Sequence, residues 1–142
     1  MSREDFASLL GALLPFAQQR LAEHGKFLPF ASAVDQQGRV RGFAGKPEAE
    51  ALPPTELVEL LVSSLRDAAQ RGEFRAGAVC CDVRVAREPG GEKVDAVSIA
   101  LEADDGTSME CYLPYTKSAA GEFEYGELFG SAVPPRIFLP AK

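Results

Sequence analysis

The sequence predicts a two-layer α+β domain, in which two main helices lie on one face of an antiparallel sheet of about five strands. Three observations predict this class. Between residues 76 and 115, apolar and polar residues alternate in three successive runs, as they do in half-buried strands. Two earlier stretches carry apolar residues at helical spacing, and strands do not alternate with helices as they do in a parallel sheet. The predicted order is therefore helix, hairpin, helix, three strands and tail, in a single domain of residues 1–142.

The first helix is predicted by apolar residues that recur at helical spacing from Phe6 to Leu21. His24 and Gly25 are typical of a last helical turn followed by a glycine in the left-handed conformation. Pro15 lies within the pattern. Because proline lacks an N–H and clashes with the preceding turn, we expect it to kink this helix or to split it in two.

A β-hairpin is expected from Phe27 to Ala44, since two short runs flank a loop with Gly38 where positive φ is needed. These strands are less apolar than the later ones, so we expect them near an edge of the sheet. A polar connector, 45–54, contains three prolines and leads into the second helix. Pro54 suits the first turn of that helix, and a stripe of leucines predicts its buried face.

The three strands between residues 76 and 115 are expected to have one apolar face under the helices and one polar face left open. The residues assigned to the apolar face are Gly77, Val79, Cys81, Val83, Val85, Val97, Ile99, Leu101, Met109, Cys111, Leu113 and Tyr115. The residues assigned to the polar face are Asp82, Arg84, Ser98, Glu102, Glu110 and Tyr112. After Lys117 we expect a short edge strand within 123–129 and an apolar tail, 133–140, whose Ile137 and Phe138 dock on the body.

The net charge of −6 disfavours nucleic acid and anionic membrane as partners, because both require a basic patch. It leaves a protein partner or a homodimer as the expected association. The chain begins with residues of mixed charge rather than a secretory signal, and no run approaches the ~20 apolar residues of a membrane span. These features predict a cytoplasmic protein.

Three cysteines, Cys80, Cys81 and Cys111, lack the Cys-x-x-Cys spacing of metal and redox sites. Cys81 and Cys111 fall on the predicted apolar face, where a free thiol behaves as a small hydrophobe. We expect buried free thiols, as in a reducing compartment, although a disulfide between these two is geometrically conceivable. The sequence assigns no metal ligand and no cofactor.

The sequence also assigns no catalytic residue, so an enzyme is not favoured. His24 is the only histidine, and a favourable interaction with the negative end of its helix explains it. A Ser-His-Asp or Cys-His arrangement would have to use this one residue. The run 104–107 has the composition of a hairpin turn, and it lacks the further oxygen ligands of a calcium loop.

The predicted polar face supplies the candidate site residues: Asp82, Arg84, Glu102, Glu110 and Tyr112. Opposite charges on neighbouring strands stabilise a sheet by about 0.2–1 kcal/mol per pair, which would explain them as a solvated face. They could also form a partner surface, with Tyr112 as an amphipathic anchor rimmed by carboxylates. A third interpretation is acid–base chemistry by Glu102 and Glu110.

Several segments carry a resemblance that spans most of the chain. They are His24–Ala31, Val34–Gly38, Glu92–Val97, Tyr112–Tyr115 and Pro135–Phe138. In these segments the sequence resembles a family of small bacterial proteins that has no assigned function, so the resemblance implies no activity and no site. The order of elements is also that of profilin-like and roadblock-like domains, an analogy of topology that carries no function.

We therefore expect a small, acidic, non-enzymatic binding module, either immunity- or inhibitor-like or chaperone-like, that acts through the open sheet face or an exposed edge strand. The alternative is a small-ligand-binding protein or an enzyme with a pocket between the first helix and the sheet, lined by Phe16, Phe27 and Phe30. A structural role as an oligomerisation domain is the third possibility. A pocket with convergent polar groups would favour the alternative, and an exposed apolar patch would favour the binding module.

Overall fold

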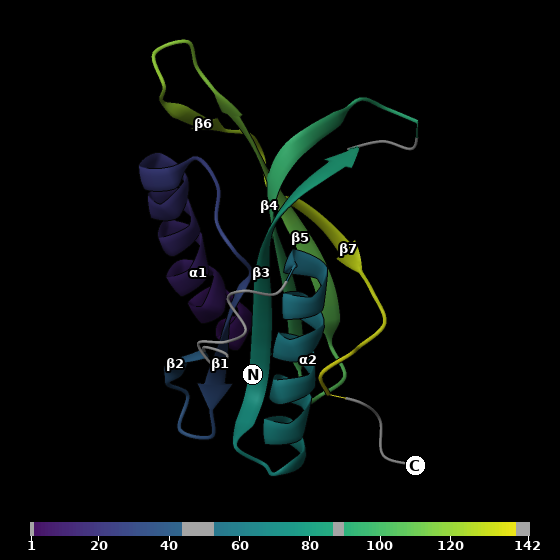
Figure 1. Ribbon diagram of the computed structural model, residues 1–142. Helices are drawn as coiled ribbons and strands as arrows, with labels where there is room; N and C mark the ends of the chain where they lie inside the picture. Colours follow the sequence, from purple (N-terminus) through teal and green to yellow (C-terminus); the bar gives the residue numbers. More distant parts are fainter. Residues whose placement is uncertain (1, 44–52, 87–89, 139–142) are drawn as a thin grey trace.

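The computed structural model describes residues 2–43, 53–86 and 90–138 (Figure 1). It contains two helices, α1 (Ser2–His24) and α2 (Pro54–Gln70). The strands are β1 (Phe30–Asp35), β2 (Val40–Phe43), β3 (Phe74–Ala86), β4 (Lys93–Ala103), β5 (Ser108–Lys117), β6 (Phe123–Tyr125) and β7 (Phe129–Ala132). The predicted connector lies outside the described residues except for its last two prolines, as do part of the turn between β3 and β4 and the end of the predicted tail.

The strands form one antiparallel sheet in the order β2-β1-β3-β4-β5-β6. The first half of β5 pairs with β7 and its second half pairs with β6, so two short strands share one edge of β5. The predicted α+β class, the two main helices and the edge position of the first hairpin are confirmed. The sheet has seven strands in the described residues, more than the predicted five. The edge strand expected within 123–129 is confirmed as β6, and β7 is a further strand in the stretch where the sequence pattern loosens.

The two helices pack against opposite faces of the sheet, which differs from the predicted two layers. Leu9, Leu13 and Leu21 of α1 belong to one buried cluster, together with Ala78 of β3. Leu57, Leu61 and Leu65 of α2 belong to a second cluster with Val79, the next residue of β3. Because successive residues of a strand point to opposite faces, the sheet lies between α1 and α2.

The physical reason is the register of β3. Ala78 pairs with Leu101 and Cys80 with Ile99, which places the even-numbered residues of β3 on the face under α1. The prediction that Gly77, Val79, Cys81, Val83 and Val85 share a face with Val97, Ile99 and Leu101 is therefore wrong. Residues 76–81 are small or apolar throughout and buried on both faces except for the half-buried Cys81, so their composition does not distinguish the two faces.

Helix α1 continues through Pro15 as a single helix, so the predicted split does not occur. Pro15 lies on the exposed side, where water can solvate the carbonyl of Gly11 that receives no N–H from residue 15. The helix ends as predicted: Gly25 has φ +75° and donates its N–H to the Leu21 carbonyl at 2.8 Å. Neither described helix has the length and apolarity needed to cross a bilayer.

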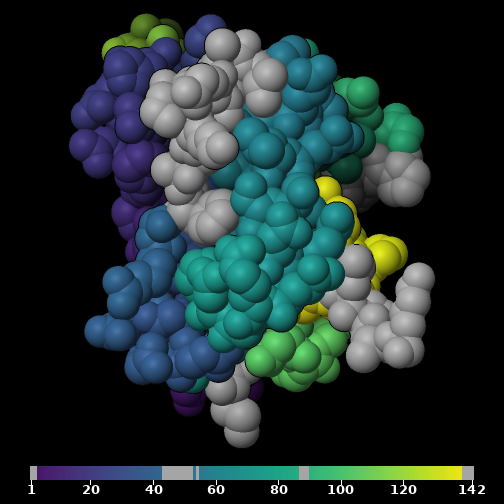
Figure 2. All heavy atoms as spheres, turned by 60° about the horizontal axis from the view of Figure 1, so that its bottom comes forward, coloured from purple at the N-terminus to yellow at the C-terminus, as the bar shows by residue number. Residues whose placement is uncertain are grey.

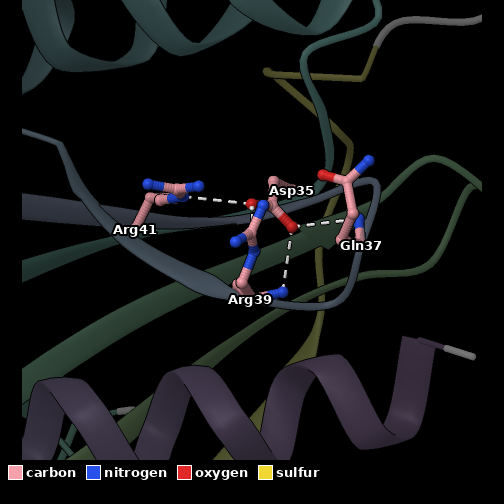
Figure 3. Close-up of polar contacts among 4 residues, drawn as sticks. All are labelled: Asp35, Gln37, Arg39 and Arg41. Carbon is pink, nitrogen blue, oxygen red and sulfur yellow. Dashed lines mark hydrogen bonds and ion pairs between the residues drawn. The ribbon is translucent and has the colours of Figure 1, made fainter.

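The carboxylate of Asp35 fixes the hairpin between β1 and β2 (Figure 3). Its Oδ1 accepts the backbone N–H groups of Gln37 and Arg39, both at 2.9 Å, and its Oδ2 accepts Nε of Arg41 at 3.0 Å. The N–H of Arg39, the Arg41 side chain and the N–H of Gln37 outweigh burial and lower the pKa of Asp35 to about 2.

The strands diverge at one end of the sheet. β3 and β4 remain paired as far as Ala86↔Lys93, whereas the pairing of β4 with β5 ends at Ala96↔Pro114. Figure 1 shows the β3–β4 and β5–β6 hairpins curving away from each other as two arms. On its other edge, β3 pairs with β1 only as far as Cys80, which lies opposite Phe30. Among the described residues, the outer half of β3 therefore pairs only with β4.

Replacing Asp35 with Asn should remove a pH-dependent part of the stability. A carboxylate whose folded pKa is depressed stabilises the fold above its ordinary pKa of 3.8, and this contribution disappears as the pH falls through about 2. Denaturant titrations at steps between pH 2 and 6 should therefore show the wild type losing its advantage over Asp35→Asn on acidification. A difference that stays constant over this range would contradict the role given to Asp35.

Candidate functional site

A groove with a volume of about 1670 Å³ lies between α1 and α2, beside the first residue of β1, Phe30. It is lined by the C-terminal half of α1, the segment that leads into β1, the first turns of α2 and the middle of β3. The groove therefore reaches both faces of the sheet, around the edge that β1 leaves open.

Three phenylalanines form the aromatic wall of the groove on the α1 side. The ring centroids of Phe16 and Phe30 are 4.8 Å apart, and those of Phe27 and Phe30 are 5.7 Å apart, both in edge-to-face geometry. These are the three rings that the sequence placed beside a pocket. Phe16 is 41% exposed and Leu28 is 49% exposed, so this wall presents apolar surface to solvent. The Arg20 guanidinium lies 4.9 Å from the Phe16 ring centroid.

Asp82 lies in the groove at the point where the two arms separate. Its Oδ1 accepts the hydroxyl of Tyr115 at 2.5 Å. Burial raises the pKa of Asp82, although the hydrogen bonds from Tyr115 and from the backbone N–H of Phe27 act in the opposite direction. The pKa of Tyr115 is raised by burial and by the adjacent Asp82. A carboxyl with a raised pKa beside a phenol is equipped to accept or donate hydrogen bonds rather than to attack a substrate.

A second polar group lies in the groove on the α2 side. Cys81, Ser98 and Tyr112 occupy one row across β3, β4 and β5, and Glu110 lies in the next row. The Ser98 hydroxyl is 3.4 Å from a Glu110 carboxylate oxygen. Burial, followed by the charge of Glu110, raises the pKa of Cys81 to about 11, and the same two causes raise the pKa of Tyr112. Arg136 lines the same part of the groove.

The predicted partner face is divided between the two sides of the sheet. Asp82 and Arg84 lie on the face under α1, whereas Glu102, Glu110 and Tyr112 lie on the face under α2. The prediction that all five share one open side is wrong, for the same reason that β3 was assigned to the wrong faces. Glu102 is only 2% exposed.

The acid–base interpretation of Glu102 and Glu110 loses its basis in this geometry. One carboxylate oxygen of Glu102 accepts the backbone N–H groups of Arg136, Ile137 and Phe138. This oxygen is therefore engaged in holding the tail. The docking of Ile137 is confirmed, since it is 2% exposed, and Phe138 is half-buried. No sequence pattern marked Arg136 as a groove residue, because its position depends on the fold of the tail.

The cysteines also change faces. Cys80 and Cys111 lie on the α1 side and are buried, whereas Cys81 lies on the α2 side and is half-buried. The conceived disulfide between Cys81 and Cys111 would have to cross the sheet, and all three thiols are free. His24 has a 58% exposed side chain, with Nε2 3.7 Å from a carboxylate oxygen of Glu23, consistent with a solvated helix end.

Within the described ranges, no three side chains among histidine, cysteine, aspartate and glutamate lie close enough together to hold a metal ion. No family model matches the chain, and neither a curated protein nor a solved structure matches it. The resemblance to a family of small bacterial proteins therefore stays a prediction, and the groove has to be interpreted from its own chemistry.

The stability of the Asp82→Asn variant should increase relative to that of the wild type as the pH rises. A carboxyl with a raised folded pKa is stabilising below its ordinary pKa of 3.8 and loses that contribution as it ionises in the folded state. The amide stays neutral and can still accept the Tyr115 hydroxyl. Free energies of unfolding measured from pH 3 to 8 should show the variant gaining on the wild type; a gain on acidification would contradict the burial of this group.

Cys81 should react slowly with iodoacetamide at pH 8. A thiol with a pKa of about 11 has a thiolate fraction about a hundredfold smaller than one with the ordinary value of 9.0, and the thiolate is the reactive form. Peptide-level mass spectrometry of the folded chain measures the rate, and Cys81→Ser identifies the contribution of the other two thiols. Alkylation as fast as that of a free cysteine would contradict the raised pKa of Cys81.

Proposed function

We propose that the protein is a non-enzymatic binding module that captures an extended peptide segment of a protein partner by strand addition to the open edge of β3. The observation that carries this proposal is that β1 begins only at Phe30, opposite Cys80, whereas β3 continues past Cys80 to Ala86. An unpaired strand edge is a template for another strand, and recognition of this kind takes its affinity from main-chain hydrogen bonds.

The orientation of the backbone supports strand addition. The Arg75 carbonyl accepts the N–H of Asp104 at 2.9 Å, so the backbone groups of odd-numbered residues of β3 point toward β4. Those of Asp82, Arg84 and Ala86 consequently point toward the side that β1 has left. Among the described residues, no backbone hydrogen bond reaches this side of 82–86. An incoming strand would satisfy these groups in sequence.

The groove supplies pockets for the side chains of such a strand. Cys81 and Val83 line it on the α2 side, together with Leu57 and Val58 of α2. Alternate side chains of an added strand would contact this apolar wall. The groove volume of about 1670 Å³ exceeds the roughly 300–1,000 Å³ of typical small-molecule sites, which favours an extended segment over a compact ligand.

The net charge and the free thiols support a basic protein partner and a reducing compartment. A net charge of −6 speeds encounter with a basic partner, as expected of an inhibitor-like or chaperone-like module. Three free thiols suit a reducing compartment such as the cytoplasm. The same edge could serve either kind of module, since both hold a segment of another protein.

A second candidate function is the binding of a small apolar ligand by the aromatic wall. The specific observation that favours it is the partial exposure of Phe16 beside the rings of Phe27 and Phe30. In this alternative the side chains of the wall, and not the backbone of β3, determine the affinity.

Arg84→Pro tests strand addition. Proline removes the N–H that points to the open side and leaves the bonds to β4 in place, since residue 84 is an edge position. Peptides selected from a displayed library of unstructured segments on the wild type should bind Arg84→Pro at least about tenfold more weakly. Binding to the matched control Arg84→Ala should stay within about threefold, because only the side chain is lost.

The two candidate functions give different results with one further variant. If binding survives Arg84→Pro but is lost in Phe16→Ala, the aromatic wall is the site and strand addition is wrong. If the library yields no ligand for the wild type, the peptide-binding proposal is also wrong. Circular dichroism and thermal melts of each variant establish that the fold is intact.

A further inference from the structure

The chain holds its own C-terminal segment, 136–138, in the manner of a bound peptide. Oε1 of Glu102 accepts three consecutive backbone N–H groups, from Arg136 at 2.8 Å, Ile137 at 2.7 Å and Phe138 at 3.2 Å. Hydrogen bonds to an ionised acceptor are about twice as strong as neutral ones. Because these three hydrogen bonds come from main-chain groups, the carboxylate recognises the backbone shape of the segment.

Two further contacts complete this site. Nε of Arg66, on α2, donates to the Arg136 carbonyl at 2.8 Å. The Ile137 side chain is 2% exposed and packs in the cluster formed by α2 and the sheet, close to Leu65 and Gly77. Figure 2 shows the yellow C-terminal segment lying against α2. Glu102, Arg66 and this socket for Ile137 are called the tail site below.

The stretch before the tail is weakly attached. The N–H of Val133 donates to the Ser108 carbonyl at 3.2 Å, and this is the last backbone–backbone hydrogen bond in the part of the chain described up to residue 138. Pro134 and Pro135 follow and carry no N–H to donate. Proline restricts the chain to extended conformations, so this stretch works as a stiff spacer between β7 and the tail site.

The tail site is unfavourable when empty. Glu102 is buried, and its recorded hydrogen bonds all come from the tail. Removal of the tail would leave a buried carboxylate without donors and an apolar socket exposed to water. The site therefore retains its own tail unless a segment of the same chemistry replaces it.

We propose that the tail site is a peptide-recognition site that binds the chain's own tail in cis and can exchange it for the tail of a second copy. A second copy presents the same three N–H groups, the same carbonyl and the same isoleucine, so exchange conserves every contact. The tethered tail has an effective concentration in the millimolar range, so the cis form dominates in dilute solution. Exchange gives a two-fold dimer at high concentration. This proposal does not depend on strand addition at β3.

Complementation between two full-length variants tests the exchange. Ile137→Asp has an intact tail site and a disabled tail, because an aspartate cannot enter the apolar socket. Glu102→Gln has an intact tail and a weakened site, because a neutral amide oxygen accepts the three N–H groups less strongly than a carboxylate oxygen. Mixed at 100 μM, the two should form a 1:1 heterodimer by light scattering, whereas each alone stays monomeric. A mixture that stays monomeric overturns the proposal.

A synthetic peptide gives the second measurement. A labelled, amidated peptide with the sequence of residues 131–138 should bind the Ile137→Asp chain and raise its melting temperature. The same peptide with Asp in place of Ile137 should bind at least about tenfold more weakly. If Ile137→Asp fails to fold, Ile137→Ala takes its place, since it empties the socket without adding a charge. Equal binding of the two peptides, or no binding of either, means that the tail is only a part of the fold.

Discussion

The structure depends on the burial of β3 on both of its faces. Its central residues are small, which allows α1 to approach from one side and α2 from the other. The clusters on the two sides contain neighbouring residues of this strand, Ala78 and Val79 among them. β1 covers one edge of β3 over half its length, and the groove begins where that pairing stops.

Much of the fold could be predicted from local patterns. The periodicity of Leu9, Leu13 and Leu21 and the glycine at position 25 specified α1, because helical spacing and a left-handed C-terminus are local properties. The alternation in β4 and β5 specified their faces correctly, since polar and apolar residues differ clearly there. In β3 the run Ala-Gly-Ala-Val-Cys-Cys has no polar member, so only its tertiary register decides which side chains face which helix.

Part of the candidate site could be predicted from the sequence. Phe16, Phe27 and Phe30 converge as expected, because Phe16 lies in the second half of α1 and the short loop after that helix brings Phe27 and Phe30 back beside it. The grouping of Cys81 with Ser98 and Glu110 could not be predicted once β3 was given the wrong faces. Arg136 reaches the groove through the fold of the tail, which depends on a buried carboxylate distant in sequence.

Three carboxylates illustrate how environment decides the role of one functional group. Asp35 is surrounded by donors, which lower its pKa, and it fixes a turn. Asp82 is half-buried in the groove beside a phenol, and this partial burial raises its pKa. Glu102 is buried deepest and serves only main-chain donors in its recorded hydrogen bonds. Composition alone counts all three as equal contributions to an acidic surface.

In the part of the chain that the structure describes, the outer half of β3 pairs only with β4, and this has a consequence for local motion. Amide hydrogens in the outer half of β3 exchange with solvent when β3 separates from β4. Those near Ala78 exchange only when the sheet opens between the two helices. Hydrogen exchange should therefore be fastest in the β3–β4 arm and slowest in the centre of the strand. A segment that binds beside the arm would have to restrict this motion, and its affinity would be reduced by the entropy lost on ordering.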